Sequence, residues 1–168
     1  MSARRGSSQR SLAPELALVA WGLPFNFLWE LAQSPAYSDW DHGSSYLLRT
    51  RLHCTAGDGL ILLGAFWGTS LVFRDRAWIA GPRKSPLALF LALGLAYTVW
   101  SEWLNVSIRS AWGYSVEMPL LFGIGVLPLA QWLVIPLLVV WVVRRRQHRR
   151  RGESDGKGAI PRQLDRGA

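Results

Sequence analysis

Long apolar runs alternate along this chain with short polar or basic segments. Four runs reach the roughly 20 residues that a helix needs to cross a bilayer; they cover residues 13–33, 53–73, 87–107 and 118–143. Pro14 suits a first helical turn, Ser34 and Pro35 end the first run, and Pro82 and Pro86 flank the connection before the third. The pattern predicts an all-α polytopic membrane protein with four transmembrane helices in an antiparallel bundle.

Composition supports this fold class and excludes others. Half of the 168 residues are hydrophobic, ten are Trp, and 18% are charged. Such a chain is neither an ordinary soluble domain nor a disordered one, and one Cys excludes a disulfide scaffold. We expect a cytoplasmic N-terminal segment at 1–12, a transmembrane domain at 13–143 and a disordered basic cytoplasmic tail at 144–168.

The basic residues predict an orientation. Three Lys or Arg lie before the first run, four lie between the second and third, and nine follow the fourth, so 16 of the 19 share one side. The positive-inside rule then places both termini in the cytoplasm of a bacterial inner membrane. A cleaved signal peptide is the alternative for the first run; Asn26 and Glu30 within it, and the lack of a small-residue cleavage site, argue against cleavage.

The net charge of +8 raises the question of an anionic partner. The basic run from Arg144 could bind nucleic acid, but no nucleic-acid-binding module precedes it. Basic residues that follow a membrane span commonly contact anionic lipid headgroups. We therefore expect the bilayer as a partner and no nucleic acid.

Polar residues interrupt the apolar runs at positions that share helix faces. Asn26, Glu30 and Gln33 follow i, i+4, i+7 spacing in the first run, as Thr98, Glu102 and Asn105 do in the third. With the predicted orientation, these groups lie in the outer half of the membrane, together with groups at the start of the second run and within the fourth. We expect one outward-facing pocket with Glu30, Asp58 and Glu102 as candidate catalytic residues. The candidate ligand-binding residues are Asn26, Trp29, Gln33, His53, Trp103, Asn105 and Gln131.

Three interpretations of these polar residues compete. Polar side chains can join helices through hydrogen bonds, which explains the amides better than it explains three carboxyl groups. His53 with the three acids could bind a metal or protons, although the chain lacks metal-ligand spacing such as Glu-x-x-His. A buried carboxyl group could also protonate a lipid-like ligand beside Trp side chains that stabilise a cation.

The polar positions form a motif series that resembles a known group. It reads N-x-x-W-E-x-x-Q from Asn26, H-C-x-x-G-D from His53, E-W-x-N from Glu102 and P-x-x-Q-W-x-x-x-P from Pro128. This series resembles small four-helix bacterial integral membrane proteins with no assigned activity. The resemblance covers about 14–143 and implies the fold and the membrane location, and no chemistry.

The functional prediction is therefore a small inner-membrane protein whose pocket binds or processes a lipid-like or isoprenoid ligand. The alternatives are a structural or accessory subunit of a membrane complex and a metal- or proton-binding membrane protein. The sequence leaves open whether the protein is an enzyme, which cofactor or metal it holds, and whether it forms a homo-oligomer.

Overall fold

A computed structural model describes the backbone of residues 14–158 and the side chains of 14–149. This described part is 77% helical and contains four α-helices. They are α1 (Pro14–Gln33), α2 (Ser44–Phe73), α3 (Lys84–Glu102) and α4 (Val126–Gly158). Within residues 14–158, three helical segments are long and apolar enough to cross a membrane, namely Ser44–Phe73, Lys84–Ile108 and Val126–Arg149.

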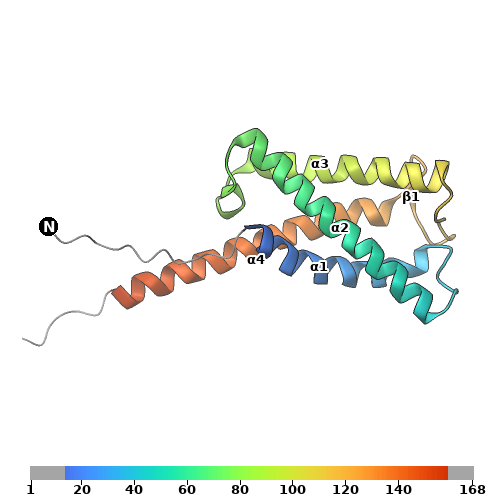
Figure 1. The fold of residues 1–168 in the computed structure, drawn as a ribbon, viewed down its shortest axis with the longest axis horizontal. Coiled ribbons are helices and arrows are strands. Elements are labelled where there is room, and N and C mark those ends of the chain that lie inside the picture. Colours follow the sequence, from blue (N-terminus) through green and yellow to red (C-terminus); the bar gives the residue numbers. More distant parts are fainter. Residues whose placement is uncertain (1–13, 159–168) are drawn as a thin grey trace, which may run out of the picture.

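The four helices surround one core. Helix α1 packs against α2 and α4, and α3 packs against the same two helices from the other side (Figure 1). Leu18, Phe66, Phe90 and Val139 contribute one core side chain from each helix. Helices α2 and α3 lie close where the short loop 74–83 joins them and diverge toward the opposite end of the molecule (Figure 1).

Helix α1 has its polar face buried and an apolar face exposed. Its buried positions are Leu18, Gly22, Asn26, Glu30 and Gln33, so the polar residues predicted to share a face point inward. Its exposed positions include Leu16, Leu28 and Leu31. A helix with an apolar exterior and a polar interior face suits a lipid environment, where exposed apolar groups carry no penalty.

Several predicted boundaries are shifted in the structure. Helix α2 begins at Ser44 rather than 53, directly after Gly43, whose φ of +94° ends the preceding loop. Helix α4 begins at Val126 rather than 118, because a short hairpin precedes it: β1 (Leu120–Leu121) pairs with β2 (Ile124–Gly125). Phe122 and Gly123 both have positive φ, as a two-residue hairpin turn requires.

Helical structure also continues past the C-terminal ends of the third and fourth apolar runs. After α3 the chain forms a π-helical turn, Trp103–Ile108, where Arg109 N–H donates to Leu104 C=O over 2.9 Å. Helix α4 continues as far as Gly158, through the first part of the tail expected to be disordered. The rest of the tail and the segment 1–12 lie outside the described residues.

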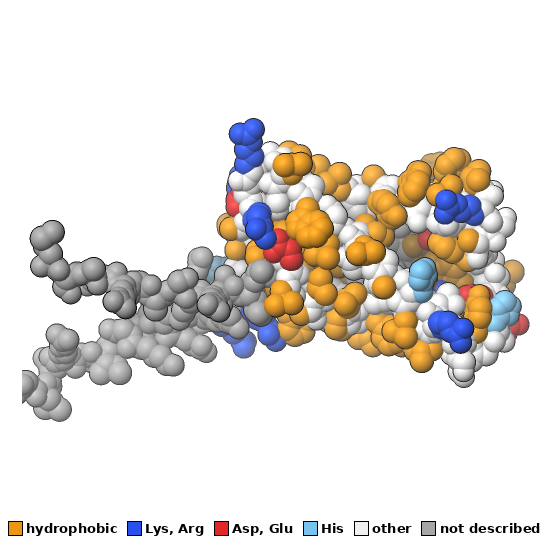
Figure 2. Space-filling view, viewed as in Figure 1, with side chains coloured by type: hydrophobic (Ala, Val, Ile, Leu, Met, Phe, Trp, Pro, Cys, Tyr) orange, Lys and Arg blue, Asp and Glu red, His pale blue; other side chains and the backbone are white. Residues whose placement is uncertain are grey.

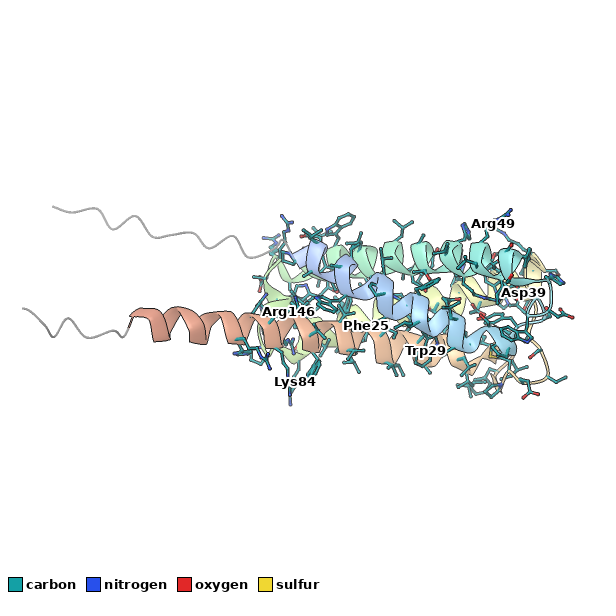
Figure 3. The ribbon with its side chains drawn as sticks, turned by 90° about the horizontal axis from the view of Figure 1, so that it is seen from below. Phe25, Trp29, Asp39, Arg49, Lys84 and Arg146 are labelled. Carbon is teal, nitrogen blue, oxygen red and sulfur yellow. The ribbon has the colours of Figure 1, made fainter. Side chains whose placement is uncertain are left out.

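Charged residues lie at the two ends of the helices. Lys84 and Arg146 lie at the end where α2 joins α3, and Asp39 and Arg49 lie at the opposite end (Figure 3). On the face in Figure 2, hydrophobic and uncharged side chains occupy most of the length between them. We call the end with Asp39 and Arg49 the distal end, because it lies farthest from both described ends of the chain.

Candidate functional site

A pocket with a volume of about 760 Å³ lies toward the distal end, between α2 and α3. Its wall includes seven of the ten residues that the sequence analysis selected: Glu30, Gln33, His53, Asp58, Glu102, Asn105 and Gln131. The structure therefore brings all three candidate carboxyl groups to one cavity. Their roles in catalysis or binding stay a prediction.

Gln131 links three helices at the floor of this pocket. Its Nε2 donates to Asn26 Oδ1 over 2.9 Å and to Asp58 Oδ2 over 2.8 Å. The Oε1 of Gln131 accepts from Gln33 Nε2 over 3.2 Å. Gln33 Nε2 also donates to Glu30 Oε1 over 2.8 Å. The amides thus satisfy Asp58 across helices and Glu30 within α1, as buried polar groups require.

Asn26 and Trp29 support this network from behind the pocket wall. Asn26 Nδ2 donates to Gly22 C=O over 2.9 Å, one turn earlier in α1. Trp29 Nε1 donates to Gln33 Oε1 over 3.1 Å. Both side chains fix the orientation of amides that do line the pocket, which is a different role from the direct ligand contact that we predicted.

Trp103 lies outside the pocket wall. It is 50% exposed and does not line the pocket, although we predicted it there. One residue of helix rotates a side chain by about 100°, so the neighbour of the inward-facing Glu102 points away. Trp132 of α4, only 3% exposed, supplies a pocket-lining indole instead.

An ion-pair group closes the distal end of the pocket. Arg51 is 2% exposed, and its Nη2 lies 2.7 Å from Asp39 Oδ1 while its Nη1 lies 3.7 Å from Glu30 Oε2. Its guanidinium lies 5.0 Å from the centre of the Tyr37 ring. Asp39 thus neutralises an arginine that the fold buries, which a buried charge requires.

Tyr114 holds the third acid from the loop between α3 and α4. Its hydroxyl donates to Glu102 Oε2 over 2.5 Å and accepts from Gly125 N–H over 3.0 Å. Burial, followed by the hydrogen bond with Glu102, raises the pKa of Tyr114. Burial and the nearby charges of Glu102 and Glu30 also raise the pKa of Tyr37. Both phenols therefore stay neutral donors at physiological pH.

Comparison of the chain with protein families, with characterised proteins and with solved structures found no match. The resemblance to small four-helix membrane proteins stays a prediction. The function is therefore inferred from the pocket itself.

The described residues do not place three His, Cys, Asp or Glu side chains close enough together to hold a metal ion. His53 lines the pocket but is exposed, and Cys54 beside it is a partly buried free thiol. The pocket has carboxyl groups and amides at one end and apolar side chains at the other.

We did not select from the sequence Arg51, Asp39, Tyr37 and Trp112, which line the pocket, or Tyr114, which bonds the pocket residue Glu102. The first three come from the α1–α2 connection and the start of α2, and the last two from the loop after α3. An isolated bridge pairs Tyr37 with Tyr114, so the two loops meet over the distal end. The abundance of aromatic and charged residues in two loops on the same predicted side was the available signal.

Proposed function

We propose that this protein is a small integral protein of the bacterial inner membrane that binds a lipid-like molecule in the pocket between α2 and α3. One observation supports this most directly. A single cavity of about 760 Å³ has carboxyl groups at its distal end and apolar side chains such as Ile61, Leu93 and Trp132 along the rest. Its size lies within the range of small-molecule sites, roughly 300–1,000 Å³.

The proposed membrane arrangement is an antiparallel four-helix bundle with both termini in the cytoplasm. Its support is the apolar exterior of α1, the three helices long enough to span, and the Lys and Arg excess near the described chain ends. Helix α1 then serves as the fourth span, and the polar face that lowers its hydropathy is buried against α2 and α4. The pocket lies in the outer half of the membrane in this arrangement.

The same site supports proton transfer to a bound molecule. Asp58 and Glu102 each receive one donor, from Gln131 and Tyr114. A carboxyl group in a water-poor pocket can hold or donate a proton at neutral pH, which is a requirement for general acid catalysis. Whether a reaction follows binding depends on the ligand.

A second candidate function is an accessory subunit of a membrane complex. The hairpin and the loop before it expose large apolar side chains at the distal end, including Val116 and Phe122, which is 97% exposed. Apolar side chains exposed in a loop often mark a contact with another protein or with the membrane.

Native mass spectrometry of the protein extracted in mild detergent tests both candidates. The proposal expects one amphipathic molecule bound per chain, identified by lipid extraction of the same sample. Replacing Gly57 and Gly64 by Leu fills the pocket, since an added Cβ at either position meets no atom within 4 Å, and occupancy should fall at least tenfold. The matched control is Leu28→Phe on the exposed face of α1, which should keep the ligand.

Different results would favour the accessory subunit. These are a protein without a bound small molecule, constant co-purification with one partner protein, and unchanged growth and complex assembly in Glu30→Gln and Glu102→Gln strains. Elemental analysis of the same sample reports any bound metal. A stoichiometric metal would overturn the lipid proposal in favour of the metal-binding alternative.

A further inference from the structure

The pocket reaches the lateral surface of the helices as well as their interior. Leu60 of α2 and Tyr97 of α3 both line it, and they are 71% and 46% exposed. The two helices diverge toward the distal end (Figure 1), and the surface is hollowed near that end (Figure 2). In a membrane this side faces the acyl chains, so a molecule dissolved in the bilayer can reach the acids without crossing water.

The apolar part of the pocket is a slot along α2 made by missing side chains. Gly57 and Gly64 lie seven residues apart on one face, and an added Cβ at either would meet open space. Gly68 continues this line, where an added Cβ would lie 3.1 Å from Leu93 Cδ1. Such a slot suits an extended hydrocarbon chain parallel to α2.

The distal end of the pocket is rich in hydrogen-bond acceptors. Four acids line it, Glu30, Asp39, Asp58 and Glu102, against one arginine, Arg51. The amide donors nearby are already engaged, because Gln33 and Gln131 each donate twice within the protein. A phosphate or carboxylate head group would add negative charge to this excess, and such like-charge contact is unfavourable.

Two buried donors lie at the same end of the pocket. Among the described residues, Arg51 Nε and Trp112 Nε1 lack a hydrogen bond of good geometry, and both residues line the pocket; Trp112 also lies near the Glu102 carboxyl group. Arg51 is 2% exposed, so its unpaired N–H is costly unless a ligand atom accepts from it. An amine head group, which is protonated at neutral pH, would donate to the acids and leave these two donors unpaired.

We propose that the pocket takes a long-chain or isoprenoid alcohol, which enters from the bilayer between α2 and α3. Its hydroxyl donates to a carboxyl group and accepts from Arg51 Nε or Trp112 Nε1, and its chain occupies the slot along Gly57 and Gly64. A hydroxyl is the simplest head group that both donates and accepts without adding charge. This inference rests on the proposed function and names its ligand class.

Four probes with the same C15 isoprenyl chain test the head group: the alcohol, its methyl ether, the primary amine and the monophosphate. Each is titrated into the purified full-length protein in nanodiscs, and binding is followed by competition with a diazirine-tagged form of the alcohol. We expect the alcohol to bind at least tenfold more tightly than the other three. The ether accepts but does not donate, so an ether as tight as the alcohol would overturn the role of the carboxyl groups.

Trp112→Phe tests the unpaired donor with a conservative change. We expect it to weaken binding of the alcohol three- to tenfold. Binding of the C15 hydrocarbon that lacks a head group should stay unchanged. Trp100→Phe is the matched control, because Trp100 is exposed on α3 outside the pocket wall. Equal effects of the two variants on the alcohol would contradict the assignment.

The outcomes separate this inference from the proposed function. If the amine or the monophosphate binds more tightly than the alcohol, the assignment of an alcohol ligand is overturned, whereas the proposal of a lipid-binding pocket stands. The same holds if the alcohol does not bind and the protein still carries an endogenous lipid after extraction. If no probe binds and no lipid is extracted, both proposals fail.

Discussion

Gln131 Nε2 lies 2.8 Å from Asp58 Oδ2 and donates a hydrogen bond that joins α4 to α2 across the floor of the pocket. Because the same amide also bonds Asn26 and Gln33 of α1, one side chain connects three helices. Within a membrane, water is unavailable to replace such bonds, so this amide contributes to the packing of the helices as well as to the pocket.

Replacing Gln131 by Leu should destabilise the protein by about 1–3 kcal/mol, because Asp58 loses its donor and Asn26 and Gln33 each lose one hydrogen bond. Asn105→Leu is the matched control. The Asn105 amide donates only to Ser101 in its own helix, at the backbone oxygen over 2.9 Å and at Oγ over 3.2 Å. Unfolding in mixed micelles measures both, and an equal loss of stability in the two variants would argue against a cross-helix role.

The orientation can be tested with single cysteines introduced into a Cys54→Ser background. Ser45 is exposed near the distal end and Ser85 is exposed at the start of α3, near the opposite end. We expect a membrane-impermeant maleimide to label Ser45→Cys on spheroplasts and to label Ser85→Cys only after lysis. The reverse labelling pattern would indicate the opposite topology, in which the pocket faces the cytoplasm.

Close packing of α3 on α4 depends on Gly94. An added Cβ at this position would collide with the ring of Trp132, which lines the pocket. Gly94→Ala should cost about 1–3 kcal/mol, as overpacking of a core does. Gly57→Ala has open space for its methyl group and should stabilise α2 by up to about 1 kcal/mol, since Ala favours a helix more than Gly does.

Thermal unfolding of the two glycine variants in the same detergent provides the comparison. A destabilised Gly57→Ala, or a Gly94→Ala with wild-type stability, would mean that the helices are arranged differently from the structure described here.

The polar pattern within the apolar runs predicted most of the site. Glu30 and Glu102 are i+4 from Asn26 and Thr98, so each acid had to share a face with other polar groups, and burial of those faces against the other helices brought them together. The three described helices that could cross a membrane were also identifiable, because length and hydropathy are properties of the sequence alone.

The contributions of the loops were not predictable in the same way. Arg51 is buried only because the preceding loop folds back to place Asp39 2.7 Å from it, and Tyr114 reaches Glu102 only because its loop turns over the end of α3. These contacts depend on loop conformation, which helical periodicity does not describe. The misplacement of Trp103 has a different cause, since composition near a polar residue does not reveal which face a side chain occupies.

Tyr114 gives a prediction that depends on pH. Its raised pKa keeps the folded phenol protonated, whereas an unfolded tyrosine ionises near pH 10. The stability that this phenol contributes is therefore fully present below about pH 10 and is lost as the pH rises toward the folded-state pKa.

Tyr114→Phe should lower stability at pH 7 by about 1–3 kcal/mol, because Glu102 and the Gly125 N–H lose their partner. The variant should also lose less of its remaining free energy of unfolding between pH 10 and 11 than the wild type does. Urea unfolding in micelles measures this difference. The exposed Tyr46, changed to Phe, is the control and should keep the wild-type alkaline slope; a Tyr114→Phe protein with that same slope would remove Tyr114 as the titrating group.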